Sequence, residues 1–292
     1  MKSIYCPYTN QKISLEESNN EHIIPKSLGG INSFSLLVDA AYNSKAGSEI
    51  DGELANDLLI LFRRRKYDAR GHSNKPPKIL SKKSFFKDSR KPLHVEFRGE
   101  KGIRVWDPIE RKELAPQDIK GKIITSSFKF SKYGRARFAA KVALATGYFI
   151  YGELFREAVN HEDLRKLMNF SEHSTREDFA NVSLKIYDQF MPTEKQEDEE
   201  ERNLQNFFCN FIGSSCVIII PGPTNLAFIV GILGQHIATL NVEANTDNFP
   251  LEGDFDLGHV IILKDNKLER ISYRELASRV KEKLDNESNK TS

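Results

Sequence analysis

Cysteine is scarce in this 292-residue chain, and the scarcity excludes several classes of protein. The three cysteines, Cys6, Cys209 and Cys216, are too few and odd in number to form a disulfide framework. Free thiols of this kind are typical of a reducing compartment, so we expect a cytoplasmic protein. Cys209 and Cys216 lie in apolar stretches and are expected in the core.

Long apolar runs are also missing. No stretch approaches the ~20 apolar residues that a membrane span requires. The first residues, MKSIYCPYTNQKISLEE, lack the apolar core of a signal peptide. The sequence GPTNLAF lacks the Gly-Lys-Ser/Thr ending of a phosphate loop. With 39% hydrophobic and 29% charged residues, the composition predicts a globular protein of one large or two ordinary domains.

Residues that can carry chemistry are concentrated between positions 21 and 47. Glu21 and His22 stand side by side before Ile-Ile-Pro and a double glycine, and Asn43 follows in the sequence YNSKAG. A carboxylate and an amide oxygen suit a hard divalent cation, and a neutral imidazole can take a proton from water. These are the parts that a one-metal phosphodiesterase needs.

The run from Glu21 to Ile24 predicts a short strand. Side chains alternate along an extended backbone, so we expect Glu21 and Ile23 on one face and His22 and Ile24 on the other. Pro25 removes a backbone donor and would end the strand. The metal ligand Glu21 and the base His22 would then project from opposite faces of one strand.

A second strand and a helix are expected after this strand. Gly29-Gly30 permits a tight return, and residues 34–38 read as the second strand. A helix is predicted from Asn43, which would lie at or just before its start. Four apolar residues at helical spacing would form its buried stripe, namely Ile50, Leu54, Leu58 and Leu61.

Residues 1–62 resemble the ββα-metal motif of HNH endonucleases. The resemblance implies metal-dependent hydrolysis of phosphodiester bonds with Mg²⁺ or Mn²⁺ as the cofactor, leaving 5′ phosphates. It assigns Glu21 as the acidic metal ligand, His22 as the general base and Asn43 as the last metal ligand. Double-stranded DNA is the expected substrate, and a role in restriction or phage defence is a further expectation.

The chain departs from the family pattern at the group that orients the base. The family places an asparagine in the middle of the motif, and that place falls near Ser33-Phe34-Ser35. Asn32 and Ser35 are therefore candidates for the group that orients the His22 ring. Asp51 is a further candidate for the surroundings of the metal, although it is also expected to cap or pair within the helix.

A second departure concerns zinc. Many relatives carry two C-x-x-C pairs around this unit, but here the first reads Cys6-Pro-Tyr-Thr9 and the second would fall at Asp39 and Tyr42. Only one thiol of the four is present, so we expect no structural zinc. Apolar packing would have to hold the hairpin instead, by Ile4, Tyr5, Tyr8, Leu36 and Leu37.

Positive charge is concentrated between Arg63 and Arg104, although the net charge of the chain is only +2. Such a bias next to a nuclease motif indicates phosphate binding, with a merely solvated surface as the alternative. Residues 92–106 predict a hairpin within this segment. The candidate nucleic-acid-binding residues are Lys26, Lys45, Arg63, Arg64, Arg65, Lys66, Lys82 and Lys83.

The remaining chain predicts a helical spine and a β-rich end. The alanine-rich residues 134–159 read as one continuous helix, whose Arg135, Arg137 and Lys141 would add to the basic face. Buried strands are expected within 214–244 and 256–263, with His236 and His259 as structural residues. A final helix over 272–284 would turn four residues inward, namely Tyr273, Leu276, Val280 and Leu284.

We therefore predict an α+β protein in which an N-terminal ββα-metal (HNH) nuclease unit is followed by a mixed α/β C-terminal region. The expected parts are the nuclease unit 1–62, a basic β-containing DNA-contact segment 63–130, and a spine with a β-rich domain over 131–292. The last part would bind DNA, sense a signal, bind a protein partner or self-associate. Two alternatives remain: a nucleic-acid-binding module with a decayed nuclease pocket, and an effector nuclease activated by a partner or signal.

Overall fold

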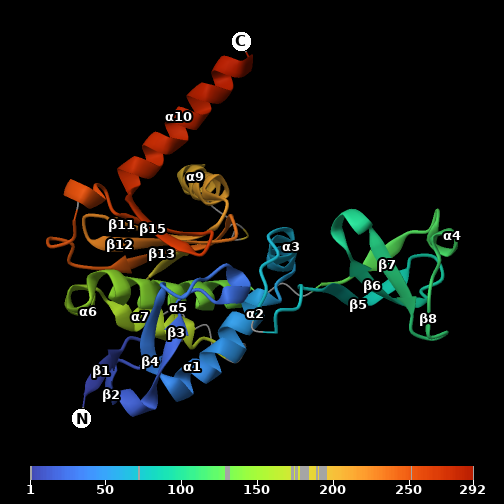
Figure 1. Cartoon of the computed structure of the whole chain (residues 1–292), viewed down its shortest axis with the longest axis horizontal. Coiled ribbons are helices and arrows are strands. Elements are labelled where there is room, and N and C mark those ends of the chain that lie inside the picture. Colours follow the sequence, from blue (N-terminus) through green and yellow to red (C-terminus); the bar gives the residue numbers. More distant parts are fainter. Residues whose placement is uncertain are drawn as a thin grey trace.

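The computed structural model describes residues 2–71, 73–128, 132–171, 174, 177, 184–188, 190, 196–250 and 252–291. It mixes helices and antiparallel strands, as the α+β prediction required. Figure 1 shows a layered main body, from which a small β-sheet body projects to one side. No helix in the described part of the chain is long and apolar enough to cross a membrane.

The N-terminal unit contains two small hairpins and an interrupted helical stretch. Its elements are β1 (Ser3–Cys6), β2 (Gln11–Ser14), β3 (Ser18–His22), β4 (Ser35–Asp39), α1 (Ala40–Ala46), a π-helical turn (Gly47–Asp51), α2 (Gly52–Ala55) and α3 (Leu58–Lys66). Strand β3 pairs with β4, and α1 follows β4 directly. The predicted order of strand, strand and helix is therefore present.

Two details of this unit differ from the prediction. Helix α1 begins at Ala40 and not at Asn43, because the Asp39 side chain caps it by accepting the Tyr42 N–H at 2.6 Å. The predicted alternation also stops at His22, because the chain bends there. Ile23 and Ile24 therefore both enter the core, each fully buried.

The apolar stripe is also divided between two helices. Ile50 and Leu54 are buried as predicted, but Asp57 ends that stretch and caps α3 through the N–H groups of Leu59 and Ile60. In the new helix Ile60 enters the core, while Leu58 and Leu61 are only half-buried.

The double glycine allows two parts of the backbone to approach closely. Gly29 adopts a φ of +85°, and its N–H closes the turn Lys26–Leu28 by donating to the Lys26 carbonyl. A Cβ at Gly30 would lie 1.5 Å from the Ile24 carbonyl oxygen. No side chain fits at Gly30, so this glycine fixes the path of the loop that returns from β3 to β4.

The projecting body, which we call the arm (residues 79–126), is a five-stranded antiparallel sheet. Its strand order is β8-β7-β6-β5-β9. A separate small core holds it together, around Leu93, Val95 and Val105. The arm contains the predicted hairpin, and its elements are β5 (Ile79–Phe86), β6 (Pro92–Phe97), β7 (Ile103–Asp107), β8 (Lys112–Glu113), α4 (Pro116–Ile119) and β9 (Ile124–Ser126).

The C-terminal region is a six-stranded antiparallel sheet covered by helices on both faces. Its strand order is β10-β13-β12-β11-β14-β15. The elements are α5 (Lys132–Tyr151), α6 (Glu153–Ala158), α7 (His161–Met168), β10 (Lys185–Tyr187), α9 (Gln196–Ile212), β11 (Ser215–Pro221), β12 (Asn225–Ile232), β13 (Gln235–Glu243), β14 (His259–Lys264), β15 (Lys267–Ser272) and α10 (Tyr273–Thr291).

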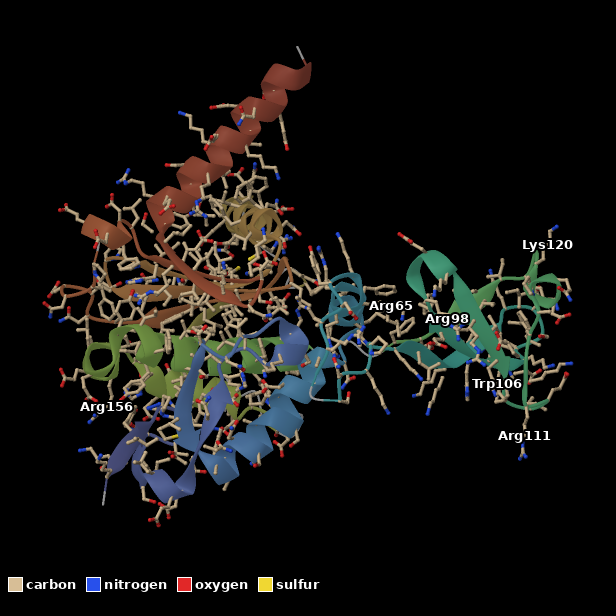
Figure 2. The ribbon with its side chains drawn as sticks, in the orientation of Figure 1. Arg65, Arg98, Trp106, Arg111, Lys120 and Arg156 are labelled. Atoms are coloured by element: carbon tan, nitrogen blue, oxygen red, sulfur yellow. The ribbon has the colours of Figure 1, made fainter. Side chains whose placement is uncertain are left out.

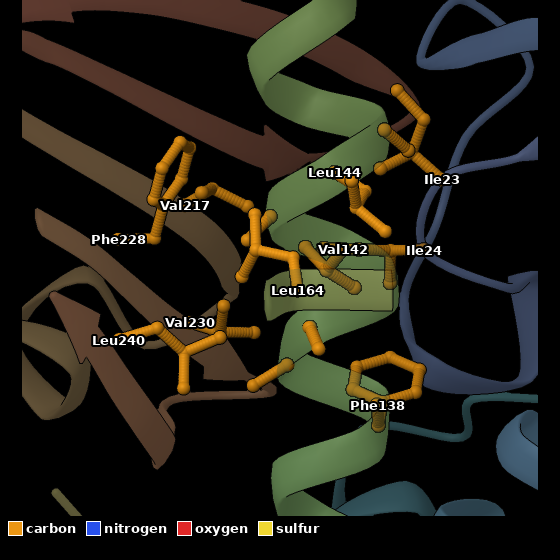
Figure 3. Packing of buried hydrophobic residues seen from close by; sticks show 14 of the residues in the cluster. Ile23, Ile24, Phe138, Val142, Leu144, Leu164, Val217, Phe228, Val230 and Leu240 are labelled. Atoms are coloured by element: carbon orange, nitrogen blue, oxygen red, sulfur yellow. The ribbon is translucent and has the colours of Figure 1, made fainter. Parts of the chain in front are cut away.

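Helix α5 is the spine of the main body, as expected, and it lies between the N-terminal unit and the sheet. Figure 3 shows Ile23 and Ile24 on one side of α5, with Phe228 and Leu240 of the sheet on the other. One hydrophobic core therefore joins the N-terminal unit to the C-terminal region. The residues next to Glu21 and His22 are anchored in that core.

Two predictions about the helices of this region are wrong. The helix expected over 134–159 breaks at Gly152, whose φ of +55° separates α5 from α6. Leu276 and Val280 face inward, but Leu284 is 47% exposed because α10 projects beyond the sheet at that point (Figure 1).

Candidate functional site

A cavity of about 330 Å³ brings the main motif residues together. It lies between the end of β3, the turn after Pro25 and the helical stretch from Gly47 to Ala55. Glu21, His22 and Asp51 line it, and so does Lys26 from the predicted nucleic-acid-binding set. The lining is otherwise formed by small or apolar residues, namely Pro25, Ser27, Gly47, Gly52, Ala55 and Gly71.

His22 is held by the asparagine that the sequence placed near it. The Nε2 of His22 lies 2.9 Å from the Oδ1 of Asn32. Since Oδ1 can only accept, this hydrogen bond places a proton on Nε2, and in the neutral ring Nδ1 then carries the lone pair. Ser35 fixes Asn32 in turn by donating from Oγ to the Asn32 carbonyl at 2.8 Å. The His22 ring is therefore held in one orientation.

Glu21 is buried and paired with a residue that the motif did not include. Lys141, on α5, is fully buried and its ammonium contacts Oε1 of Glu21. The same ammonium donates to both carboxylate oxygens of Asp51, at 2.9 and 2.7 Å. One lysine therefore joins the predicted metal ligand to the predicted supporting carboxylate.

Burial and charge act against each other in this cluster. Burial raises the pKa of Asp51 to about 6, and the negative charge of Glu21 adds to the rise while Lys141 opposes it. For Lys141, burial lowers the pKa, but the two carboxylates more than offset this and the net shift is upward. Lys141 is therefore a charged ammonium in the interior.

Asn43 does not line the cavity. Its side-chain amide donates to Oδ1 of Asn19 on β3 at 2.8 Å. It lies one turn before Gly47, whose N–H donates to the Asn43 carbonyl. A Cβ at Gly47 would meet no atom within 4 Å, so the helix leaves open space beside the cavity.

The donors around the cavity suit a hard cation. Carboxylate oxygens such as those of Glu21 and Asp51 are ligand types that Mg²⁺ and Mn²⁺ accept. Among the residues that the structure describes, no three His, Cys, Asp or Glu side chains form a ready metal cluster. A cation held here would therefore need water or substrate phosphate to complete its coordination, as Mg²⁺ commonly does.

The positions of the missing zinc knuckle are close together and filled by other contacts. Cys6 Sγ accepts the Asp39 N–H at 3.3 Å, and the rings of Tyr8 and Tyr42 lie 5.8 Å apart. Of the five residues expected to hold the hairpin, Leu37 is 40% exposed. The other four are buried or packed against the core, namely Ile4, Tyr5, Tyr8 and Leu36.

The predicted basic residues divide into two groups. Arg64 and Arg65 donate to backbone carbonyls of Ala55 and Arg98, and Arg63 donates to Asn210. These three arginines therefore link α3 to its neighbours. The remaining candidates are exposed, namely Lys26, Lys45, Lys66, Lys82 and Lys83. Figure 2 shows further basic side chains on the arm, among them Arg98, Arg111 and Lys120.

The prediction that the helix over 134–159 adds to the basic face is wrong for two of its three cations. Arg135 is fully buried, within 3.6 Å of Asp57 and 3.4 Å of Asp188. Lys141 is buried against Glu21 and Asp51. A lone lysine in the apolar run FAAKVALA was the signal for such a partner, because a charge is not buried unpaired.

A larger groove of about 1100 Å³ adjoins this cavity. Lys26 lines both, and the groove also contains Asn32, the partner of His22. Its far wall comes from the C-terminal sheet, including Ser214 and the β14–β15 turn with Lys264. The sequence contained no signal that these distant segments would meet beside the motif.

No protein-family model, curated protein or solved structure matches this chain. Its function is therefore inferred from the geometry of this site and from the resemblance of its motif.

Proposed function

We propose that this protein is a metal-dependent endonuclease of the HNH kind. The observation that carries the proposal is the His22–Asn32 hydrogen bond of 2.9 Å, beside two carboxylates in one cavity. Structural histidines such as His236 are also hydrogen-bonded to side chains, but the oriented ring of His22 lines a cavity that it shares with two carboxylates. A general base needs both a fixed ring and open space beside it.

Each residue would have a definite task. His22 would take a proton from the attacking water on Nδ1, while Asn32 keeps the ring in its orientation. Glu21 would hold a Mg²⁺ or Mn²⁺ ion, and Asn43, which lies outside the cavity, would become a second oxygen ligand only after giving up its hydrogen bond to Asn19. When bound, the cation would supply Lewis-acid stabilisation of the charge that develops on the phosphate and leaving oxygen. Lys26, exposed at the edge of the cavity, would contact the phosphate backbone.

The proposed substrate is double-stranded DNA. A duplex presents regularly spaced phosphates, and the exposed lysines of the arm and the groove would contact them without reading sequence. The groove would receive the strand next to the scissile bond, because Lys26 and Asn32 connect it to the catalytic cavity. Such an enzyme would serve in restriction or phage defence.

The test is cleavage of supercoiled plasmid with Mg²⁺ or Mn²⁺. We expect His22→Ala to lower the cleavage rate about 10²–10⁴-fold, with melting temperature and DNA affinity nearly unchanged. Glu21→Gln and Asn43→Ala should each raise the cation concentration needed for half-maximal cutting. Lys12→Met, on the exposed strand β2, is the control for a surface substitution. High residual activity in His22→Ala would show that His22 is not the general base.

One observation favours a second candidate. Because Lys141 already pairs with Glu21, the pocket is compatible with a nucleic-acid-binding module that no longer cuts. That protein would bind DNA with the same salt dependence, but it would leave the plasmid intact at every concentration of Mg²⁺ and Mn²⁺.

A further inference from the structure

Lys141 brings a buried positive charge to the two carboxylates of the cavity. It contacts Glu21 and Asp51, which both line the catalytic cavity, and its side chain is fully buried. The lysine comes from α5, outside the motif, so the spine helix supplies a charge to the site. The core that fixes α5 also fixes this ammonium, since Leu144 and Val142 beside it are fully buried.

A buried ammonium of this kind is stable only with its carboxylates in place. Removing one partner of a buried ion pair leaves an uncompensated charge and is strongly destabilising. Two carboxylates and one ammonium give the cluster a net charge of −1. Without the lysine, the pair would carry a charge of −2 once a bound cation displaces the proton that burial favours on Asp51.

We propose that Lys141 sets the charge of the carboxylate pair and so makes the cavity a weak cation site that needs substrate phosphate for tight binding. The inference rests on the proposed function, because it concerns the same site. The affinity of an oxygen-ligand site increases with its count of charged ligands. With one carboxylate charge neutralised by Lys141, only one remains for a divalent cation. The backbone phosphate of the nucleic acid would supply the next charge.

The measurement is Mn²⁺ binding to the full chain without nucleic acid, by electron paramagnetic resonance of free Mn²⁺. We expect Lys141→Met to bind Mn²⁺ about tenfold or more tightly than the unsubstituted protein, because an unpaired carboxylate charge then faces the cation. Lys12→Met removes the same charge from the exposed strand β2 and should leave the affinity unchanged. A short DNA duplex should tighten Mn²⁺ binding to the unsubstituted protein more than to Lys141→Met.

A double variant separates charge from fold. Lys141→Met combined with Asp51→Asn restores the net charge of −1 and leaves no buried carboxylate without a partner except Glu21. Its Mn²⁺ affinity should return to near that of the unsubstituted protein. Where Lys141→Met alone is too unstable for a binding measurement at equilibrium, its melting temperature serves as the readout. Millimolar Mn²⁺ should raise the melting temperature of Lys141→Met much more than that of the double variant, because tighter binding to the folded protein stabilises it more.

The outcomes distinguish this inference from the proposed function. If Glu21→Gln weakens Mn²⁺ binding but Lys141→Met does not strengthen it, Lys141 has no role in setting affinity and the nuclease proposal stands. If Lys141→Met binds Mn²⁺ tightly but no variant cuts DNA, the charge-setting role stands and the nuclease proposal fails. Equal affinity in Lys141→Met and the double variant would overturn the charge-setting role itself.

Discussion

At the scale of single residues, the site depends on side chains that hold other side chains. His22 is positioned by Asn32, and Asn32 by Ser35, in a chain of two hydrogen bonds of 2.9 and 2.8 Å. Substitution of a group that orients a reactive residue usually lowers the rate by less than substitution of the reactive residue itself. The three positions therefore predict a graded series of variants.

We expect Asn32→Ala to lower the cleavage rate about 10–100-fold, because His22 then loses the acceptor that fixes its tautomer and ring orientation. Ser35→Ala should cost less, since only the backbone of Asn32 loses a donor. Mn²⁺ affinity should stay the same in both, because the structure describes no hydrogen bond from either side chain to Glu21 or Asp51. The check is single-turnover cleavage across pH: a loss in Asn32→Ala that equals the loss in His22→Ala would mean that Asn32 has a direct role.

The residues of this site were predictable only where they are close in the sequence. Glu21, His22 and Asn32 were identified from the motif, and the structure places them around or beside one cavity. Asp51 was identified as a supporting residue, and it lines the same cavity. Lys141 was assigned to a basic surface, because a sequence does not show which charge lies opposite a helical lysine ninety residues away.

At the scale of elements, the strands and the spine helix followed from apolar runs, whereas the ends of helices did not. Strands β11, β12 and β13 were expected from their continuous apolar residues. Helix α1 begins earlier than predicted because Asp39 caps it. The spine breaks at Gly152, whose positive φ could not be read from an otherwise helical pattern. Local capping and one backbone angle decided both cases.

The sheet also contains a histidine whose burial makes stability depend on pH. His236, on β13, is fully buried, and its Nε2 lies 2.9 Å from Oγ1 of Thr239, whose hydroxyl donates to Gln205. Burial, together with the nearby charge of Arg135, lowers the pKa of His236 to about 3. The folded protein therefore keeps His236 neutral in a range where the unfolded chain binds a proton.

We expect this histidine to stabilise the fold above its ordinary pKa of about 6.5 and to lose that contribution as pH falls toward 3. The loss should be about 1.4 kcal/mol per pH unit, the value for one proton bound only by the unfolded state. His236→Gln keeps a donor for Thr239 but does not titrate. The measurement is the free energy of unfolding in urea from pH 8 to pH 5. Below the ordinary histidine pKa, its slope against pH should be smaller in His236→Gln by the equivalent of one proton. Equal slopes would refute the assignment.

At the scale of the whole molecule, the division of the chain into hydrophobic cores does not coincide with its division into charged segments. One hydrophobic core runs from Cys6 through α5 to Leu263, so the motif unit and the C-terminal region support each other. The arm has a core of its own and joins the rest near α3, where Phe62 and Phe97 pack with ring centroids 6.1 Å apart. The sequence indicated the basic bias of the arm, but long-range packing decided which cations remain exposed.

This division predicts where affinity for DNA originates. Arg63, Arg64 and Arg65 link α3 to its neighbours, so replacing them together should lower the melting temperature as well as binding. Lys82 and Lys83 are exposed at the β-bulge of β5, where their side chains make no internal hydrogen bond or ion pair that the structure describes. The arm lysines are therefore the cleaner test of the basic segment.

We expect Lys82→Gln with Lys83→Gln to weaken binding equally on all DNA sequences and to leave the melting temperature unchanged. The slope of log affinity against log salt should fall by about 0.9 for each duplex phosphate that a lysine no longer neutralises. Lys264→Gln, in the groove wall, should reduce the slope by a similar amount per phosphate and also lower cleavage at saturating DNA, because the groove leads directly to Lys26 and Asn32. If only the groove variant changes the salt slope, the duplex is held by the C-terminal sheet and not by the arm.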